Sequence, residues 1–581
     1  MTSAATRPWA AMTIAEAQAR LTAPGARFEM EEVAIRGVPT RVFRNAPPTL
    51  RHIFATARGY GPGRTFIVHE EERVDYEAFA RASLALAAGL AARGVGKGDR
   101  VAVAMRNLPE WIAGVQATFV LGAVAVPLNA WWSGEELEYG LRDCGARIAL
   151  VDHERYERLR PHLSACPGLE HVLVARAQAA LVETKASRLE DLIGTVAAWG
   201  DLPDRPIPTT PLWPEDDAAI CYTSGTTGRP KGAVLTHRNI ASNVLSAGFA
   251  LARHQLRRGQ APQPPDRGVQ RAALIAVPLF HVTGLCSNLT PLMNLGAKLV
   301  LMPRWDAGAA LALIERERVN QTGGVPTIAW QLLEHPQRTK HDLSSLDILT
   351  YGGAPSAPVL AEAIKAGLPD ATAGQAWGMT ETAGVFTSHV GDDYARRPDS
   401  CGLPVPTGDL RIVGARGQGL PPGEIGELCV RGPQVARGYW GQAEATAQSF
   451  EDGWLRTGDL ASVNEEGFVV IHDRAKDMLI RGGENIYCIE VEHLLQAHPA
   501  VAEAALIGRP HRTLGEEPVA VVALAAGAAV LESELRDFVR VRLAAFKVPV
   551  AVHIWPGPLP RNPSGKILKT MLKKRLYSEV V

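Results

Sequence analysis

The sequence is organised around one glycine- and hydroxyl-rich stretch, Tyr222-Thr-Ser-Gly-Thr-Thr-Gly-Arg-Pro-Lys-Gly232. Apolar runs precede it at 218–222 and follow it at 233–235, which predicts two short strands joined by a polar loop. Its glycines allow positive φ, and consecutive N–H groups can then form an anion-binding concavity. The hydroxyls and Lys231 add further donors to phosphate. The stretch therefore predicts a phosphate-binding loop, although not a Walker A loop, because no Gly-Lys-Ser/Thr opens a helix.

Length and composition indicate a globular enzyme of more than one domain. The 581 residues exceed what one core usually holds, and 46% of them are apolar. The 61 basic residues balance the 61 acidic ones, so nothing points to nucleic acid. The 7 cysteines are scattered without a Cys-x-x-Cys pair, which predicts reduced thiols in a cytoplasmic protein without a zinc site. We see no secretory signal in residues 1–20 and no apolar run of about 18 residues.

Strand-like and helix-like segments alternate after a surface-wrapping segment expected over residues 1–47. The alternation predicts parallel strands in covered α/β sheets. Ligands bind such sheets at the carboxyl ends of the strands, where Tyr222, Phe280, Tyr351 and Gln375 are expected. The expected strands are 66–69, 100–104, 124–127, 148–151, 274–280, 297–302, 321–325 and 346–351, and the expected helices include 76–93, 109–121, 133–143 and 239–251.

The pattern changes twice towards the C-terminus. Short β-like segments from 405 to 471 predict a small β-barrel, and a compact α+β domain of about one hundred residues follows from about 476. The fold class is therefore α/β: a large N-terminal domain of α/β sheets plus a small β-barrel (1–474), then a small α+β C-terminal domain (475–581), which the family resemblance given below implies to be mobile. Residues 254–271 are polar, basic and broken by proline, and are expected to form a mobile excursion that does not pack.

Two further motifs carry groups suited to a nucleotide. The stretch Gly374-Gln-Ala-Trp-Gly-Met-Thr-Glu-Thr382 offers a flat aromatic face, a hydroxyl and a carboxylate that could bind Mg²⁺, although Thr-Glu is also a common helix cap. In Trp454-Leu-Arg-Thr-Gly-Asp459 the carboxylate could accept both hydroxyls of a ribose, although Thr-Gly-Asp alone is usually a turn.

Together with three later motifs, these stretches resemble the adenylate-forming superfamily, and its acyl-CoA synthetase and fatty-acid–CoA ligase branch in particular. The later motifs are Asp473–Asp477, Arg481–Tyr487 and Pro560–Lys566, and the resemblance covers about residues 50–575. The chain departs from the family at Cys488, where members usually have proline.

The resemblance implies a role for each matching residue. Lys566, Glu381, Thr380 and Lys231 would be catalytic, with Glu381 the metal ligand and Lys476 the hinge between the domains. The nucleotide would contact Thr223, Ser224, Gly225, Thr226, Thr227, Gly228, Lys231, Gly353, Ala354, Pro355, Gln375, Ala376, Trp377, Gly378, Met379, Thr380, Asp459, Arg474 and Lys566. The acyl substrate would contact His281, Val282, Leu285, Val325, Tyr351 and Gly352, and coenzyme A would contact Arg481, Gly482, Gly483 and Glu484.

The activity that the resemblance implies is ATP-dependent acyl-CoA synthesis, with ATP, Mg²⁺, coenzyme A and a carboxylic acid as small-molecule partners. A carboxylate would attack ATP to give acyl-AMP and pyrophosphate, and the thiol of coenzyme A would then release AMP. An enzyme that passes acyl-AMP to a carrier protein, a luciferase and a nucleotide-binding scaffold remain alternatives. A cytoplasmic location is expected, and weak peripheral membrane association and a homodimer are left open.

The segments expected around the acyl group suggest an apolar acid. Segments 280–285, 323–325 and 351–353 contain no Asp or Glu that could pair with a buried amino group. We therefore expect a medium- or long-chain fatty acid, with an aryl or polycyclic acid as the alternative. The glycines at 323, 324, 352 and 353 are expected to leave room for a chain or ring.

Overall fold

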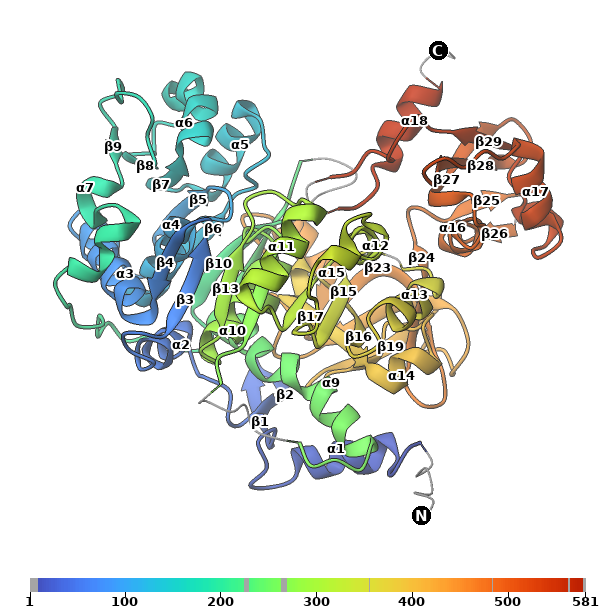
Figure 1. Cartoon of the computed structure of the whole chain (residues 1–581), viewed down its shortest axis with the longest axis horizontal. Helices are drawn as coiled ribbons and strands as arrows, with labels where there is room; N and C mark the ends of the chain where they lie inside the picture. The colour runs from blue at the N-terminus through green and yellow to red at the C-terminus, as the bar shows by residue number, and fades with distance from the viewer. Residues whose placement is uncertain are drawn as a thin grey trace.

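The computed structural model describes residues 9–223, 229–262, 269–354, 356–482, 484–562 and 565–577. A large body built on two α/β sheets carries a smaller domain at its side, drawn in orange and red in Figure 1. The predicted α/β class, with a large sheet-containing domain and a small C-terminal domain, is confirmed.

The first sheet contains the predicted phosphate loop between two of its strands. Its strands β10 and β11 form an antiparallel hairpin, and β10 also pairs in parallel with β6. The order is β21 (Gly438–Tyr439), β11 (Gly232–Thr236), β10 (Asp217–Tyr222), β6 (Val124–Pro127), β5 (Arg100–Ala104), β7 (Ile148–Asp152), β8 (His171–Ala175) and β9 (Ala186–Arg188).

The second sheet is parallel at its centre and antiparallel at both edges. The order is β18 (Leu403–Pro404), β17 (Gly384–Val390), β16 (Thr372–Met379), β15 (Ile348–Gly352), β14 (Gln321–Gly324), β12 (Ala272–Ile275), β13 (Lys298–Leu301), β3 (Thr65–His69) and β4 (Glu72–Asp75).

Helices fill the space between the sheets and cover their outer faces. Every residue of α4 is buried, as expected of a helix that is apolar all round and lies between two sheets. The inner layer contains α2 (Leu50–Arg58), α3 (Tyr76–Ala91), α4 (Pro109–Leu121), α8 (His237–Ala241), α10 (Thr290–Asn294) and the π-helix η3 (Thr283–Leu289). The outer layers contain α5 (Gly134–Cys144) and α6 (His153–Leu159) on the first sheet, and α11 (Ala307–Glu317), α12 (Pro326–Glu334) and α13 (Val359–Gly367) on the second.

Two further sheets follow in the C-terminal part of the chain. The predicted small barrel is a five-stranded antiparallel sheet of β19 (Asp409–Val413), β20 (Gly426–Arg431), β22 (Phe450–Glu451), β23 (Trp454–Val463) and β24 (Val469–Arg474). The small domain contains β25 (Leu479–Arg481), β26 (Glu484–Ile486), β27 (Val501–His511), β28 (Gly515–Leu524), β29 (Ala551–Ile554), α16 (Cys488–Gln496), α17 (Glu532–Arg540) and α18 (Lys569–Tyr577).

The N-terminal segment is more regular than the sequence suggested. Thr13 and Glu16 form a capping box at the start of α1 (Ile14–Thr22), and β1 (Met30–Ile35) and β2 (Val38–Phe43) form a hairpin. Apolar residues of α1 pack against α9 (Asn243–Arg257). The remaining helices are α7 (Glu190–Ile193), α14 (Gly391–Arg396) and α15 (Ala443–Ser449), and within the described ranges none is long and apolar enough to cross a membrane.

The prediction of an unpacked excursion at 254–271 is wrong at both of its ends. The buried Arg257 closes α9 and pairs with Asp393 at 3.1 Å. At the other end Gln270 donates to the Thr65 carbonyl at 2.6 Å, and Arg271 pairs with Asp347. The polar composition was misleading because each of these side chains has a specific partner; residues 263–268 lie outside the described ranges.

One buried side chain joins the two large sheets. Asn107, which follows β5, donates from its amide to the carbonyls of Val277 at 3.0 Å and Met302 at 3.1 Å. Its Oδ1 accepts the N–H of Leu279 at 2.9 Å. Asn107 is 5% exposed, so these groups have little access to water. The amide therefore fixes the segment after β12, which leads to His281.

We predict that Asn107→Ala lowers the free energy of unfolding by about 2 kcal/mol, because the change leaves buried carbonyls and one N–H without a partner. The midpoint of urea unfolding measures the effect. Asn45→Ala is the matched control, since Asn45 donates to two carbonyls in an exposed loop. Equal midpoints for the two variants would contradict this assignment.

Candidate functional site

The ends of the predicted phosphate loop are held together by backbone contacts. The N–H of Thr223 donates to the Lys231 carbonyl at 2.9 Å, which continues the β10–β11 hairpin by one residue. The N–H of Lys231 reaches Thr223 Oγ1 at 3.4 Å. The central residues of the predicted loop, 224–228, lie outside the described ranges.

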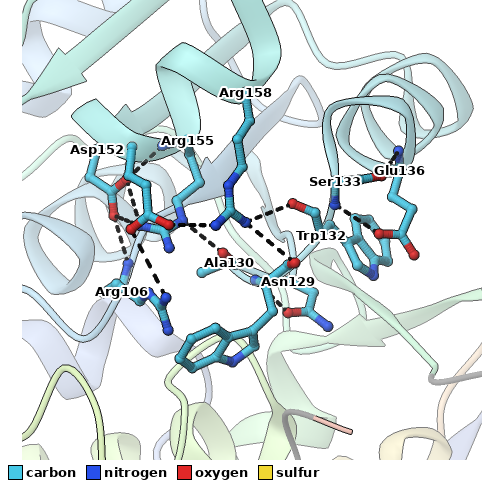
Figure 2. A network of polar contacts seen from close by, with 11 residues as sticks. Arg106, Asn129, Ala130, Trp132, Ser133, Glu136, Asp152, Arg155 and Arg158 are labelled. Carbon is cyan, nitrogen blue, oxygen red and sulfur yellow. Dashed lines mark hydrogen bonds and ion pairs between the residues drawn. The ribbon is translucent and has the colours of Figure 1, made fainter.

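A network of arginines holds the segment that follows β6, as Figure 2 shows. Arg155 is 1% exposed, pairs with Asp152 at 3.0 Å and donates to the Ala130 carbonyl at 2.7 Å. Arg158 donates to the Trp132 carbonyl at 3.1 Å. The indole of Trp132 lies 5.7 Å from the ring of Tyr222, which directly precedes the phosphate loop. The network therefore fixes the segment after β6 and, through it, the entrance to the phosphate loop.

Asp459 brings together residues from three strands. This carboxylate is 2% exposed and accepts the Trp377 indole N–H at 2.8 Å. Its other oxygen pairs with Arg474 Nε at 2.8 Å, directly across the β23–β24 pairing. The predicted aromatic, acidic and basic residues therefore meet at one point, although they are far apart in sequence.

Glu381 has a partner that the sequence analysis missed. Its carboxylate is 6% exposed and accepts the Tyr439 hydroxyl at 2.7 Å. Lys231 Nζ lies 5.0 Å from the centre of the Tyr439 ring. Tyr439 lies between two predicted site residues, but no motif quoted from the sequence contains it. Pairing of β21 with β11, which the sequence pattern did not reveal, brings it there.

The predicted catalytic lysine reaches the large domain. The N–H of Lys566 donates to Asn562 Oδ1 at 2.9 Å, which closes a loop that Figure 1 shows extending from the small domain towards the large body. Within this loop Gly565 has φ of +82°, and a Cβ there would lie 2.7 Å from Val325 of the large domain. Residues 563 and 564 lie outside the described ranges.

The charge of Lys566 is set by its surroundings in the large domain. Burial, aided by the charge of Arg474, lowers the pKa of the Lys566 amine to about 8, against the opposing effects of Asp459 and Glu381. Burial, aided by Lys566, lowers the pKa of His281 to about 4, so this imidazole is neutral near pH 7. Its Nε2 has no hydrogen-bond partner among the described residues.

Three residues expected to contact the acyl group belong to hydrophobic clusters. Val282 and Leu285 belong to the core between the two large sheets, and Leu285 is 0% exposed. Tyr351 is buried in the cluster under α13, and its hydroxyl meets that of Tyr394. Their contact with an acyl group remains a prediction.

The prediction that glycines leave room for the substrate is wrong at three of its four positions. A Cβ at Gly323 would lie 1.8 Å from the Thr350 carbonyl oxygen, and one at Gly352 would lie 2.2 Å from that of Ala376. At Gly324 the side chains of Ile328 and Val277 fill the space. Gly353, with φ of +74°, has no heavy atom within 4 Å of the corresponding position. Gly323 and Gly352 are therefore required for close contact between strands, and Gly324 for the packing of two side chains.

The remaining predicted nucleotide residues follow the second sheet. Gln375, Ala376, Gly378 and Met379 lie on β16, and Thr380 opens the short helix η5 (Thr380–Thr382) directly after it. Ala354 follows β15, and Pro355 lies outside the described ranges.

The residues expected to bind coenzyme A lie on the small domain. Arg481 ends β25, Gly482 turns with φ of +61°, and Glu484 opens β26; Gly483 lies outside the described ranges. The predicted hinge residue Lys476 follows β24. Close to it, the N–H of Cys488 donates to Asp473 at 2.5 Å. Proline has no N–H, so the residue usual in the family could not make this bond.

Several known proteins are similar to this chain in sequence and in fold. The family model described as AMP-binding enzyme matches residues 53–440, and that of its C-terminal domain matches residues 490–566. A feruloyl-CoA synthase of Amycolatopsis sp is 37% identical over 88% of this chain and 96% of its own length. A long-chain-fatty-acid–CoA ligase of Bacillus subtilis is 33% identical over 90% and 94%. The crystal structure of an anthranilate CoA ligase with anthranoyl-AMP superposes with a TM-score of 0.81, at 26% identity over 92% of this chain and 98% of that one.

We predict that Gly323→Ala lowers the free energy of unfolding by about 2 kcal/mol or more, because the added methyl group collides with main chain that cannot move aside. Gly200→Ala is the matched control, since nothing lies within 4 Å of its Cβ position. Urea unfolding compares the two variants. If the unfolding midpoint of Gly323→Ala equals that of the control, Gly323 has free space beside it, as the sequence analysis expected.

Proposed function

Because this chain belongs to the AMP-binding enzyme family, in the acyl-CoA synthetase branch of the adenylate-forming superfamily, we propose that its site joins a carboxylic acid to coenzyme A in two steps. In the first step a carboxylate oxygen attacks the α-phosphorus of ATP, and the bond to pyrophosphate breaks. In the second step the sulfur of coenzyme A attacks the acyl carbon, and the bond to AMP breaks as the thiol loses its proton.

The observation that carries the proposal is that the Lys566 loop lies against Val325 of the large domain, where the charges of Arg474, Asp459 and Glu381 act on the buried Lys566 amine. The first step concentrates negative charge on the α-phosphate, where an ammonium group in a water-poor site stabilises it most. Asp459, already placed beside the Trp377 indole, would accept the ribose hydroxyls. This arrangement supports a docked pose of the small domain that serves the first step.

The carboxylate of Glu381 fits a role as ligand of Mg²⁺. One oxygen accepts a hydrogen bond from the Tyr439 hydroxyl. The other oxygen is left to bind a hard cation, which phosphate oxygens would also coordinate. When bound, the cation would neutralise phosphate charge. Lys231 lies on the same tyrosine ring, so it would contact the phosphates close to that cation.

The second step requires a different part of the small domain. The loop of Arg481, Gly482 and Glu484 would replace Lys566 at the acyl-adenylate after rotation near Lys476. The hydrogen bond from the Cys488 N–H to Asp473 joins α16 to β24 across this hinge, so it would have to change when the small domain rotates. Hinges are a few residues that absorb large changes in backbone angles, which suits a short connection between β24 and β25.

For the acid we propose an apolar aryl acid. Close packing at Gly323, Gly324 and Gly352 removes room that was expected for either a chain or a ring, so these positions favour neither acid. The feruloyl-CoA synthase relative and the anthranilate ligase structure support a ring. A fatty acid is the second candidate, because the Bacillus subtilis ligase is similar over 90% of this chain.

We predict that kcat/KM for CoA-dependent AMP release is at least about ten-fold higher for ferulate or anthranilate than for dodecanoate, a preference of about 1.4 kcal/mol. The measurement is steady-state AMP release over a panel of aryl and C2–C16 acids, with and without coenzyme A. A rate that rises with each added methylene would favour the fatty acid instead.

We predict an alkaline limb near pH 8 in kcat/KM for exchange of pyrophosphate into ATP. The amine must be protonated to neutralise phosphate, so activity is retained below its pKa of about 8 and falls about ten-fold per pH unit above it. Lys566→Arg keeps its charge to higher pH and should lose this limb. An unchanged limb in Lys566→Arg would assign it to another group.

A further inference from the structure

Tyr439 lies between the two charged groups that would hold the phosphates. Its hydroxyl donates to Glu381 Oε1 at 2.7 Å, and its ring centre lies 5.0 Å from Lys231 Nζ. The two partners come from distant parts of the chain: Lys231 precedes β11 and Glu381 lies in η5 after β16. One side chain therefore contacts both.

The fold holds Tyr439 in place from several directions. Strand β21 pairs with β11 through Ala233 and Val234, and the N–H of Trp440 donates to the Gly232 carbonyl at 2.8 Å. The N–H of Tyr439 itself donates to Thr446 Oγ1 at 2.9 Å.

Neighbouring residues also fix the Tyr439 ring and the position of η5 relative to it. The Tyr439 ring packs edge-on against Phe450 at 5.5 Å. In the same segment the N–H of Ala436 donates to the Glu381 carbonyl at 2.8 Å. The tyrosine is therefore rigid on both its main-chain and ring sides.

This rigidity restricts what the Glu381 carboxylate can do. A hydroxyl bonded to one oxygen fixes the rotation of the carboxylate and leaves the second oxygen for a cation. A charge-assisted hydrogen bond of this kind is among the stronger polar contacts. The aromatic face beside Lys231 attracts its ammonium group through the ring quadrupole. Without the hydroxyl, a 6% exposed carboxylate would lose a partner and its orientation.

We propose that Tyr439 is a positioning residue that orients the Glu381 carboxylate towards Mg²⁺ and, through its ring, keeps Lys231 beside the same phosphates. This inference rests on the proposed function. It adds a residue that no motif in the sequence indicated, and it assigns different tasks to the two parts of one side chain: the hydroxyl serves the metal ligand and the ring serves the lysine.

Tyr439→Phe separates these tasks, because it removes the hydroxyl and keeps the ring. We expect the affinity for MgATP, measured by calorimetry on the full chain, to fall about ten-fold. Affinity for ATP in the presence of EDTA should change less than about two-fold, because the ring beside Lys231 remains. The Mg²⁺ concentration for half-maximal pyrophosphate exchange should rise in parallel, with a smaller effect on kcat at saturating Mg²⁺.

Tyr439→Leu removes both contacts and should weaken ATP binding with and without the metal. Tyr76→Phe is the matched control, since its hydroxyl makes a single buried bond to the Ala297 carbonyl, at 2.8 Å, in the core. That variant should bind MgATP as the wild type does, and urea unfolding of all three variants tests whether they are folded.

Two outcomes would overturn the proposal. MgATP affinity within about two-fold of wild type in folded Tyr439→Phe protein would show that the hydroxyl does not orient Glu381. An equal loss of ATP affinity with and without Mg²⁺ would show that the hydroxyl contributes to nucleotide binding and not to the metal ligand. Wild-type protein that neither binds MgATP nor exchanges pyrophosphate would instead contradict the proposed function, so the two failures are distinguishable.

Discussion

The buried carboxylate of Asp459 is the point on which the site depends. A charge that is 2% exposed is costly unless it is paired, and here an indole N–H and a guanidinium supply the compensation. The first comes from the second large sheet and the second from β24, the last strand before the small domain. This carboxylate therefore fixes the five-stranded sheet against β16, where we propose that the nucleotide binds. The charge of Asp459 also acts on the ammonium group of Lys566, which belongs to the small domain.

Much of this arrangement could be predicted from the sequence, because the relevant signals are local. Apolar runs identified the central strands of both large sheets, and glycines with hydroxyls identified the β10–β11 hairpin, whose loop ends at Lys231. The strand Trp454–Val463 is longer than the short segments expected there, and Asp459 lies on it although Thr-Gly-Asp alone is usually a turn. The order of the motifs also identified the family, which the family models match over residues 53–440 and 490–566.

What could not be predicted depends on pairing across the chain. Tyr439 gains its importance from a two-residue strand that joins β11, and no periodicity marks so short an element. Arg257 looked like part of a solvated basic run, but a buried aspartate more than one hundred residues away accepts it. The glycines near the acyl group were correctly noticed and wrongly interpreted. Sequence shows that a side chain is absent, whereas only the fold shows whether a ligand or a neighbouring strand uses the space.

Whether a ligand or a neighbouring strand uses the space beside a glycine affects how the substrate specificity of such a protein can evolve. At Gly323 and Gly352, in the segments predicted to line the acyl group, main chain packs against main chain, so any larger residue there disturbs the sheet. Substitutions at these two positions would destabilise the fold, so they are not available for the evolution of new substrate specificity. Under the proposed function, a change of acid would have to come from other elements around the acyl group. A lineage that changes its acid would then keep an almost unaltered sheet at these two positions.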